Sequence, residues 1–201
     1  MLLLDFENQG IRSAVWHVTE TVEQLVSIHP NGIHLYEQSK SKFKSNSRIK
    51  EWLAVRVLLN HMLGSNAEIV YTENGAPRLK GSNTHISISH TKEYACIALS
   101  DIYKVGVDIE HISNKAERVK SRFIGENEPD DTLLKTILIW SAKESAYKML
   151  QIEGIDFKKD MKVYPFHQAE CGCLAIMCMN NIYDVLYSIK NDFVMTLIYS
   201  K

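Results

Sequence analysis

The stretch Val-Gly-Val-Asp-Ile-Glu at residues 105–110 carries the most information about fold and chemistry. Side chains alternate across a β-strand, so its three β-branched residues point one way while Asp108 and Glu110 point the other. Two carboxylates on one face repel each other unless a cation lies between them, and Gly106 on that face leaves room for a ligand to approach the backbone. An edge strand with a solvated acidic face shows the same alternation, so this stretch alone leaves a metal site and a solvated surface equally open.

A second informative stretch, Trp-Ser-Ala-Lys-Glu-Ser-Ala-Tyr-Lys at residues 140–148, lies in a predicted helix. Glu144 and Lys148 are one turn apart and share a face of that helix. An ordinary exposed ion pair, which contributes about 0.3 kcal/mol, has the same spacing. Together with the two carboxylates of the strand, Glu144 completes a set of three without histidine or thiolate. Such a hard oxygen set suits Mg²⁺ that keeps waters and takes phosphate oxygens from a substrate.

Length and composition exclude several classes of protein. The 201 residues are 45% hydrophobic and 23% charged, which is typical of a globular chain and excludes a disordered one. The net charge of -1 provides no basic excess for nucleic acid or a membrane surface. The apolar residues 1–4 are too few for a signal peptide, and no apolar run reaches the ~20 residues that span a bilayer. We therefore expect an intracellular, cytoplasmic protein with reduced thiols.

The cysteines raise one alternative, a zinc site. Cys171, Cys173 and Cys178 could supply three thiolates, but a fourth ligand at a familiar spacing is missing. The stretch 173–179 is better interpreted as a buried strand, in which free cysteine behaves as a small hydrophobic residue. We therefore assign no role to the cysteines.

Two long helices and a series of strands are predicted along the chain. The helices cover about 48–63, followed by Gly64, and about 130–150, capped by Asp130 or Asp131. A helix-like stretch of undefined extent begins the chain, followed by a polar segment at 39–47. The predicted strands lie at 85–90, 94–100, 105–110, 162–165, 173–179, 183–190 and 193–199.

The chain also contains a weak internal repeat. The segment 51–56 resembles 139–144, and 89–99 can be laid over 188–198. Short amphipathic segments resemble one another by chance as well, but here the order of the elements also repeats. This order favours a duplication.

These elements predict an α+β fold with two similar halves, at residues 1–102 and 103–201. Each half is expected to pack a long helix on a mostly antiparallel sheet. The repeat predicts a pseudo-two-fold arrangement of the halves.

Four separated motifs then occur in a defined order: Gly-Ala-Pro at 75–77, Ile-Ser-Ile-Ser-His at 86–90, Asp-Ile-Glu at 108–110, and the helical stretch 140–148. Together they resemble the 4′-phosphopantetheinyl transferase superfamily, and its two-half, surfactin-synthetase-activating type most closely. The resemblance spans about 48–150 and implies the fold of that superfamily. It also implies that the first half carries coenzyme A-binding elements and the second half metal-binding and catalytic elements.

For the second half, the resemblance implies a magnesium site. Asp108, Glu110 and Glu144 would hold Mg²⁺ against the pyrophosphate of coenzyme A, and Lys148 would contact the phosphates during catalysis. Glu128 matches a family glutamate that lies near the metal and its water, although the residues after it depart from the family pattern.

For the first half, the resemblance implies binding of coenzyme A. Arg56 lies where the family places an arginine against the 3′-phosphate. Ser89 and His90 fall in the phosphate-binding segment of the family. An imidazolium near a phosphate is chemically apt, whereas a lone histidine at a strand end is more often structural or solvated.

This chain departs from the family pattern in the loop where the family has Gly-Lys-Pro. It corresponds to Gly75, Ala76 and Pro77, so alanine replaces a lysine that would help to hold coenzyme A. Arg78, two residues on, is the candidate substitute. The departure favours a second hypothesis, a divergent relative that binds coenzyme A or a carrier protein without transferring anything. A third, an unrelated magnesium-dependent phosphatase, leaves the first two motifs unexplained.

The implied reaction transfers the 4′-phosphopantetheine group of coenzyme A to a serine of an acyl or peptidyl carrier protein and releases 3′,5′-ADP. Glu144 would take the serine proton, directly or through a water positioned with Glu128. A chain that contains both halves would form its site in the cleft between them, bind one coenzyme A and act as a monomer.

Overall fold

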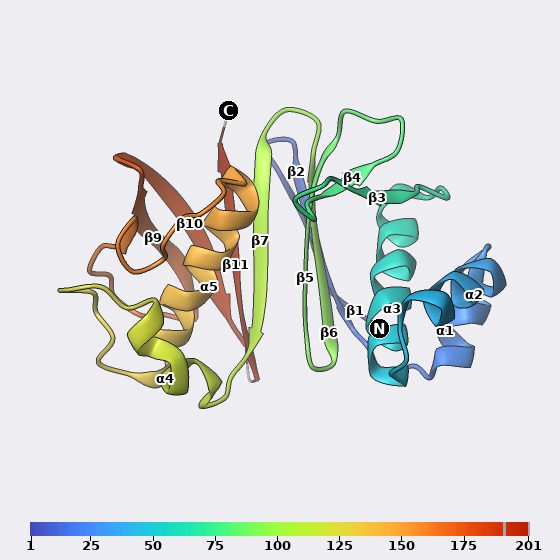
Figure 1. Ribbon diagram of the computed structural model, residues 1–201, viewed down its shortest axis with the longest axis horizontal. Coiled ribbons are helices and arrows are strands. Elements are labelled where there is room, and N and C mark those ends of the chain that lie inside the picture. Colours follow the sequence, from blue (N-terminus) through green and yellow to red (C-terminus); the bar gives the residue numbers. More distant parts are fainter. Residues whose placement is uncertain (191, 201) are drawn as a thin grey trace. The chain divides into compact units, whose positions relative to one another are not determined.

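The structure is a computed structural model that describes residues 1–190 and 192–200 (Figure 1). The chain divides into two compact units, the first ending at Asp101 and the second beginning at Ile102. Each unit combines helices with antiparallel strands, so the predicted α+β class is confirmed. Within the described part of the chain, no helix has the length and apolar character needed to cross a bilayer.

The first unit is built on an antiparallel sheet with the strand order β1-β2-β6-β5, beside a separate β3-β4 pair. Three helices lie between β2 and β3 in the sequence, and α3 packs its apolar side against the sheet (Figure 1). The elements are β1 Leu2–Asn8, β2 Ile11–His17, α1 Val22–Ile28, α2 Gly32–Lys42, α3 Asn46–Leu63, β3 Ile69–Tyr71, β4 Pro77–Leu79, β5 His85–Thr91 and β6 Tyr94–Ser100.

Three expectations for this unit have different outcomes. Helix α3 ends as predicted at Gly64, whose φ of 63° is the left-handed conformation that favours glycine after a helix. The helix-like start is wrong, because β1 and β2 pair as a hairpin across Gln9 and Gly10. Both turn residues have positive φ, at 52° and 79°, which suits a two-residue hairpin turn. The polar segment 39–47 is helical up to Lys42, as the end of α2, and again from Asn46, where α3 begins.

The second unit is built on an antiparallel sheet with the order β7-β11-β10-β9-β8, and α5 lies across one of its faces (Figure 1). Buried side chains of α5 and of the inner strands form one apolar core. The elements are β7 Lys104–His111, α4 Lys115–Val119, a 3₁₀ turn Lys120–Arg122, α5 Leu133–Leu150, β8 Met161–Val163, β9 Cys171–Cys178, β10 Asn181–Ile189 and β11 Phe193–Ser200.

The predicted cap of α5 is wrong by one or two residues. Thr132 is the N-cap, and its hydroxyl accepts a hydrogen bond from the Lys135 amide at 3.2 Å. Asp131 instead pairs with the Lys135 ammonium at 2.8 Å. Threonine in extended backbone can satisfy an amide of the first turn, so the aspartate one residue earlier is free to bind the lysine.

The internal repeat has a counterpart in the strand registers of the two units. In the β5-β6 hairpin Ser89 is opposite Cys96, and in the β10-β11 hairpin Ser188 is opposite Met195. The predicted superposition of 89–99 on 188–198 aligns Ser89 with Ser188 and Cys96 with Met195, so it places one cross-strand pair on the other. The duplication and the pseudo-two-fold arrangement remain predictions.

Candidate functional site

Strand β7 presents Asp108 and Glu110 on the face of its sheet that α5 covers. The close approach of helix and strand depends on Gly106, because a Cβ there would lie 1.9 Å from the carbonyl oxygen of Ser145 in α5. The expectation that Gly106 leaves room for a ligand is therefore wrong, since the helix backbone fills that space. Instead, Gly106 allows Glu144 and Lys148 of α5 to approach the carboxylates of β7.

Asp108 and Lys148 form a close ion pair. The ammonium of Lys148 donates to Asp108 Oδ1 at 2.6 Å and to the carbonyl oxygen of Val107 at 3.2 Å. Asp108 is buried, whereas the Lys148 side chain is 25% exposed. A cation therefore lies against this carboxylate in the structure, and it belongs to the chain itself.

Glu110 is oriented by Trp140, whose indole N–H donates to Glu110 Oε1 at 2.8 Å. The indole is in turn packed against Phe123 and Phe157, with ring centroids 5.0 and 5.8 Å away. Burial raises the pKa of Glu110, and the negative charge of Asp108 adds to that effect. The tryptophan of the 140–148 motif thus holds one of the strand's carboxylates in place.

Glu144 completes the acidic group. Burial raises its pKa to about 7, with further contributions from the charges of Asp108 and Glu110, while Lys148 opposes the shift. The three carboxylates therefore lie close enough to repel one another. Among the residues that the structure describes, no group of three histidine, cysteine or acidic side chains is already arranged to hold a metal ion.

Glu128 has different surroundings, with both carboxylate oxygens occupied by the chain itself. Oε2 accepts from the Lys143 ammonium at 2.7 Å and from the Gly125 amide, and Oε1 accepts from the Val163 amide at 2.7 Å. The side chains of Glu128 and Lys143 are both fully buried. The structure therefore places Glu128 in a buried ion pair, and its catalytic role remains a prediction.

Lys143 is a residue to which the sequence analysis assigned no role. Its ammonium has four acceptors within hydrogen-bond distance, which its three N–H groups share: Glu128, the Phe123 carbonyl at 2.6 Å, the Phe157 carbonyl at 2.9 Å and the Met161 carbonyl at 3.1 Å. Burial lowers the pKa of this lysine, and the Glu128 carboxylate opposes the shift. The sequence gives no signal of this role, because a lysine in a helix is usually exposed.

In the first unit, Arg56 of α3 is 7% exposed. Its guanidinium lies over the Trp52 indole, 3.2 Å from the ring centroid, and donates to the Trp52 carbonyl oxygen at 3.0 Å. Burial lowers the pKa of Arg56 to about 10, and the Tyr71 hydroxyl opposes the shift. A guanidinium held in this way keeps its charge at neutral pH.

Two cavities in this unit share Trp52 and Arg56 in their walls. The smaller, of about 150 Å³, is also lined by Tyr71, His90 and Glu51, and the larger has about 330 Å³. His90 Nδ1 lies 3.6 Å from Glu51 Oε2, while Ser89 is buried in β5. The structure thus brings Arg56 and His90 to one cavity, together with a carboxylate that the sequence analysis had not considered.

The Gly-Ala-Pro loop closes the turn between β3 and β4. Gly75 has a φ of 77°, and Thr72 exchanges backbone hydrogen bonds with Gly75 and Ala76 at 2.9 Å. The Thr72 hydroxyl also accepts from the Ala76 amide at 3.1 Å. Pro77 begins β4, followed by the exposed Arg78. The loop is therefore ordered without the lysine of the family.

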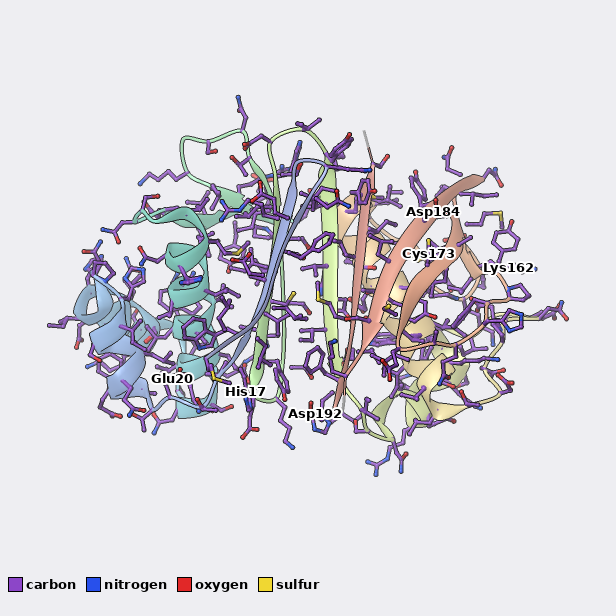
Figure 2. All side chains as sticks on the ribbon, turned by 180° about the vertical axis from the view of Figure 1, so that it is seen from behind. His17, Glu20, Lys162, Cys173, Asp184 and Asp192 are labelled. Carbon is purple, nitrogen blue, oxygen red and sulfur yellow. The ribbon has the colours of Figure 1, made fainter. Side chains whose placement is uncertain are left out.

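The cysteines are arranged unfavourably for zinc. Cys171 and Cys173 are exposed on β9, whereas Cys178 is buried, because the strand's alternation places it on the other face. Figure 2 shows Cys173 near Asp184 of the neighbouring strand β10. Burial raises the pKa of Cys173, which disfavours the thiolate that zinc requires.

Comparison with known proteins gives a partial match to curated transferases. No protein-family model matches the chain. Over 112 residues the chain is 34% identical to a protein named 4′-phosphopantetheinyl transferase AcpT from Escherichia coli strain K12, covering 50% of this chain and 57% of that protein. Proteins of the same name from Escherichia coli O157:H7 and Salmonella typhimurium strain LT2 match at 34% over 112 residues, covering 57% and 58% of their lengths. The match spans little more than half of these relatives, and it supports the 4′-phosphopantetheinyl transferase superfamily.

Proposed function

We propose that the protein belongs to the two-half type of this superfamily and transfers the 4′-phosphopantetheine group of coenzyme A to a serine of an acyl or peptidyl carrier protein. The observation that carries the proposal is the convergence of Asp108, Glu110, Glu144 and Lys148 on one face of the second unit. Structural ion pairs also bring charges together, but three mutually repelling carboxylates near one lysine are typical of a site that handles phosphates.

The donor set fits a magnesium ion. Burial and mutual repulsion raise the pKa values of Glu110 and Glu144, and a divalent cation would relieve that repulsion. Asp108, Glu110 and Glu144 would hold the ion, since all three offer hard oxygen ligands. When bound, the ion would offset the charge of the coenzyme A pyrophosphate.

The protein's own groups would move the proton and the charge. Glu144 would accept the proton of the serine hydroxyl directly or through a water, and the bound ion would lower its pKa from the raised value that burial gives it without the metal. The serine oxygen would form a bond to the phosphorus next to the pantetheine arm, and the bond from that phosphorus to the oxygen bridging to the nucleotide would break. The electron pair would leave with 3′,5′-ADP, and Lys148 would stabilise the charge on the departing phosphate.

Glu128 is assigned a supporting role in this proposal. Its oxygens accept from Lys143, Gly125 and Val163, so its buried ion pair joins the loop before α5 to that helix and to β8. The first unit supplies coenzyme A-binding groups, with Arg56 as the principal cation.

The transfer is tested by intact-mass measurement of a panel of unmodified carrier proteins. Each carrier is incubated with the protein, coenzyme A and Mg²⁺, and in parallel with a chelator in place of Mg²⁺. We expect at least one carrier to gain the mass of one phosphopantetheine group, only with Mg²⁺. Modification that persists in the chelator would contradict the magnesium assignment.

A second function is favoured by one observation, the alanine at position 76. A divergent relative that only binds coenzyme A would tolerate the loss of that lysine. It would bind coenzyme A in calorimetry and leave every carrier in the panel unmodified. The retained carboxylates and Lys148 favour the transferase, because a binding module has no evident use for them.

A further inference from the structure

The ammonium of Lys148 and the proposed metal ion require the same carboxylate. Asp108 Oδ1 accepts a hydrogen bond from Lys148 Nζ at 2.6 Å, and Asp108 is also one of the three oxygen donors proposed for Mg²⁺. A magnesium ion binds its oxygen ligands at about 2.0 to 2.1 Å, closer than the ammonium lies, and two cations on one buried carboxylate repel each other. The arrangement in the structure is therefore the one in which lysine holds Asp108.

Asp108 is the fixed partner of this ion pair. It lies in β7, which pairs with β11 along its whole length, and its side chain is 4% exposed. A short, buried side chain of this kind turns away only if the strand moves with it. An exchange of partners at Asp108 therefore has to come from the lysine.

Lys148 can leave the ion pair without a change of backbone. It lies in the last turn of α5, its side chain is 25% exposed, and its ammonium is carried on a flexible four-carbon stem. The other lysine of the motif, Lys143, has no exposed side-chain surface and is surrounded by four acceptors. Lys148 thus has the access to solvent that Lys143 lacks.

The charge of Lys148 also acts on the two neighbouring acids. Burial and the charge of Asp108 raise the pKa values of Glu110 and Glu144, and Lys148 opposes both shifts. A divalent cation among the three carboxylates would act in the same direction and more strongly, because it carries twice the charge. In the structure, Lys148 therefore supplies the counter-charge that a metal ion would supply.

We infer that Lys148 is an exchangeable counter-ion of Asp108: it pairs with the carboxylate when no divalent cation is bound, and it turns outward to the phosphates of the substrate when one binds. The identity of those phosphates rests on the proposed function, whereas the exchange between lysine and metal does not. Because the metal releases the cation that the phosphates need, the two binding events are coupled. By reciprocity, a phosphate ligand that draws Lys148 away tightens metal binding by the same factor.

The test is titration of the whole chain with Mn²⁺, without coenzyme A or carrier, followed by the electron paramagnetic resonance signal of the free ion. Mn²⁺ prefers the same hard oxygen ligands as Mg²⁺. A buffer of about pH 8.5 under argon limits protonation of the carboxylates and oxidation of the ion. We expect Lys148→Met to bind Mn²⁺ about tenfold more tightly than the wild type, since an opposite charge this close changes proton binding to a carboxylate by a similar factor.

Lys115→Met is the matched control. The charge of Lys115 also lowers the pKa of Glu110, but this lysine forms no ion pair with Asp108 in the part of the chain that the structure describes. Its loss should tighten Mn²⁺ binding by no more than about twofold. Urea unfolding adds a second readout: without metal, Lys148→Met leaves Asp108 buried without its lysine, so it should be less stable than the wild type and gain more stability from excess Mg²⁺.

The outcomes separate the exchange from the proposed function. Equal Mn²⁺ affinity of the wild type and Lys148→Met, equal tightening by Lys115→Met and Lys148→Met, or no saturable binding by either protein would overturn the inference. A Lys148→Met chain that folds only with Mg²⁺ would support it, and one that stays unfolded in excess Mg²⁺ would overturn it. Because neither measurement contains coenzyme A or carrier, a failed exchange leaves the transfer assay to decide the activity, and absence of transfer leaves the exchange standing.

Discussion

The ammonium of Lys143 lies 2.7 Å from Glu128 Oε2, and neither side chain has any exposed surface. The same ammonium also donates to three backbone carbonyls, from Phe123, Phe157 and Met161. One lysine of α5 thus joins two segments that are distant in the sequence. Since Glu144 is the next residue of α5, this pair also fixes the part of the helix that carries the proposed base.

Breaking this ion pair should therefore make the protein easier to unfold. We expect Lys143→Met to lower the free energy of unfolding by about 3 to 5 kcal/mol, because it leaves the Glu128 carboxylate buried without a counter-charge. Urea denaturation measures the change. The double variant Lys143→Met with Glu128→Leu should recover part of the loss, whereas Lys143→Met within about 0.5 kcal/mol of wild type would show that the pair contributes little.

The carboxylates of the second unit should be needed for transfer. Asp108→Asn and Glu144→Gln keep side-chain size and remove one hard ligand, so we expect the rate of carrier modification to fall by about 100-fold or more. Glu153→Gln, which changes an exposed acid just after α5, is the control and should keep the wild-type rate. A wild-type rate for Asp108→Asn would rule out the magnesium assignment.

His29 should make the protein less stable in mild acid. Its pKa in the folded chain lies below the ordinary histidine value of about 6.5, because burial and the charge of Arg56 disfavour the imidazolium. As the pH falls below 6.5, the unfolded chain binds the proton and the folded chain does not, so the free energy of unfolding decreases. Above that pH the ring is neutral in both states and the effect vanishes.

Urea midpoints between about pH 7.5 and pH 5 measure this dependence. His29→Asn, which keeps an acceptor for the Asn31 amide, should flatten the decline on the acid side. The exposed His61 of α3 supplies the matched variant His61→Asn. An unchanged decline in His29→Asn would mean that other groups cause it.

Restoring the family lysine should strengthen coenzyme A binding. Ala76→Lys adds one partly exposed cation to an ordered loop, for which we expect about 1 kcal/mol tighter binding in calorimetry. Asn74→Lys adds the same charge to the same turn and controls for its general effect. If both variants bind equally, or Ala76→Lys binds no better than wild type, Arg78 or another loop path already fills the role.

The protein should act as a monomer that binds one coenzyme A. The proposed cation of the first unit, Arg56, and the acidic group of the second unit each occur once in the chain, so we expect one coenzyme A site per chain. Light scattering combined with titration measures both numbers. Two bound molecules per chain, or activity lost on dilution to monomer, would contradict the prediction.

The strands and long helices followed from the sequence wherever periodicity was strong. Helix α5 and the strands of its sheet bury regular apolar faces, so alternation and helical spacing locate them. The N-terminal hairpin was missed, because its register depends on the turn at Gln9 and Gly10 more than on apolar alternation in β1. Gly106 was misinterpreted, since only the packed structure shows that a helix backbone fills the space beside it.

For the candidate site, sequence reasoning found the residues that belong to motifs. Asp108, Glu110, Glu144 and Lys148 were selected by type and spacing, and the structure brings them together. Lys143 was missed, because a lysine in a helix is usually exposed and only the tertiary fold reveals four buried acceptors around it. Arg56 was selected through the resemblance, whereas its contact with the Trp52 indole and its place beside Glu51 in the smaller cavity appear only in the packed structure.

The central claim is that the chain is a catalyst, and counting turnovers tests it most directly. One equivalent of protein is mixed with a large excess of unmodified carrier, coenzyme A and Mg²⁺, and modified carrier and released 3′,5′-ADP are quantified together. The proposal predicts many modified carriers per protein and one 3′,5′-ADP for each. Coenzyme A binding without modification of any carrier in the panel would contradict it and identify a binding protein instead.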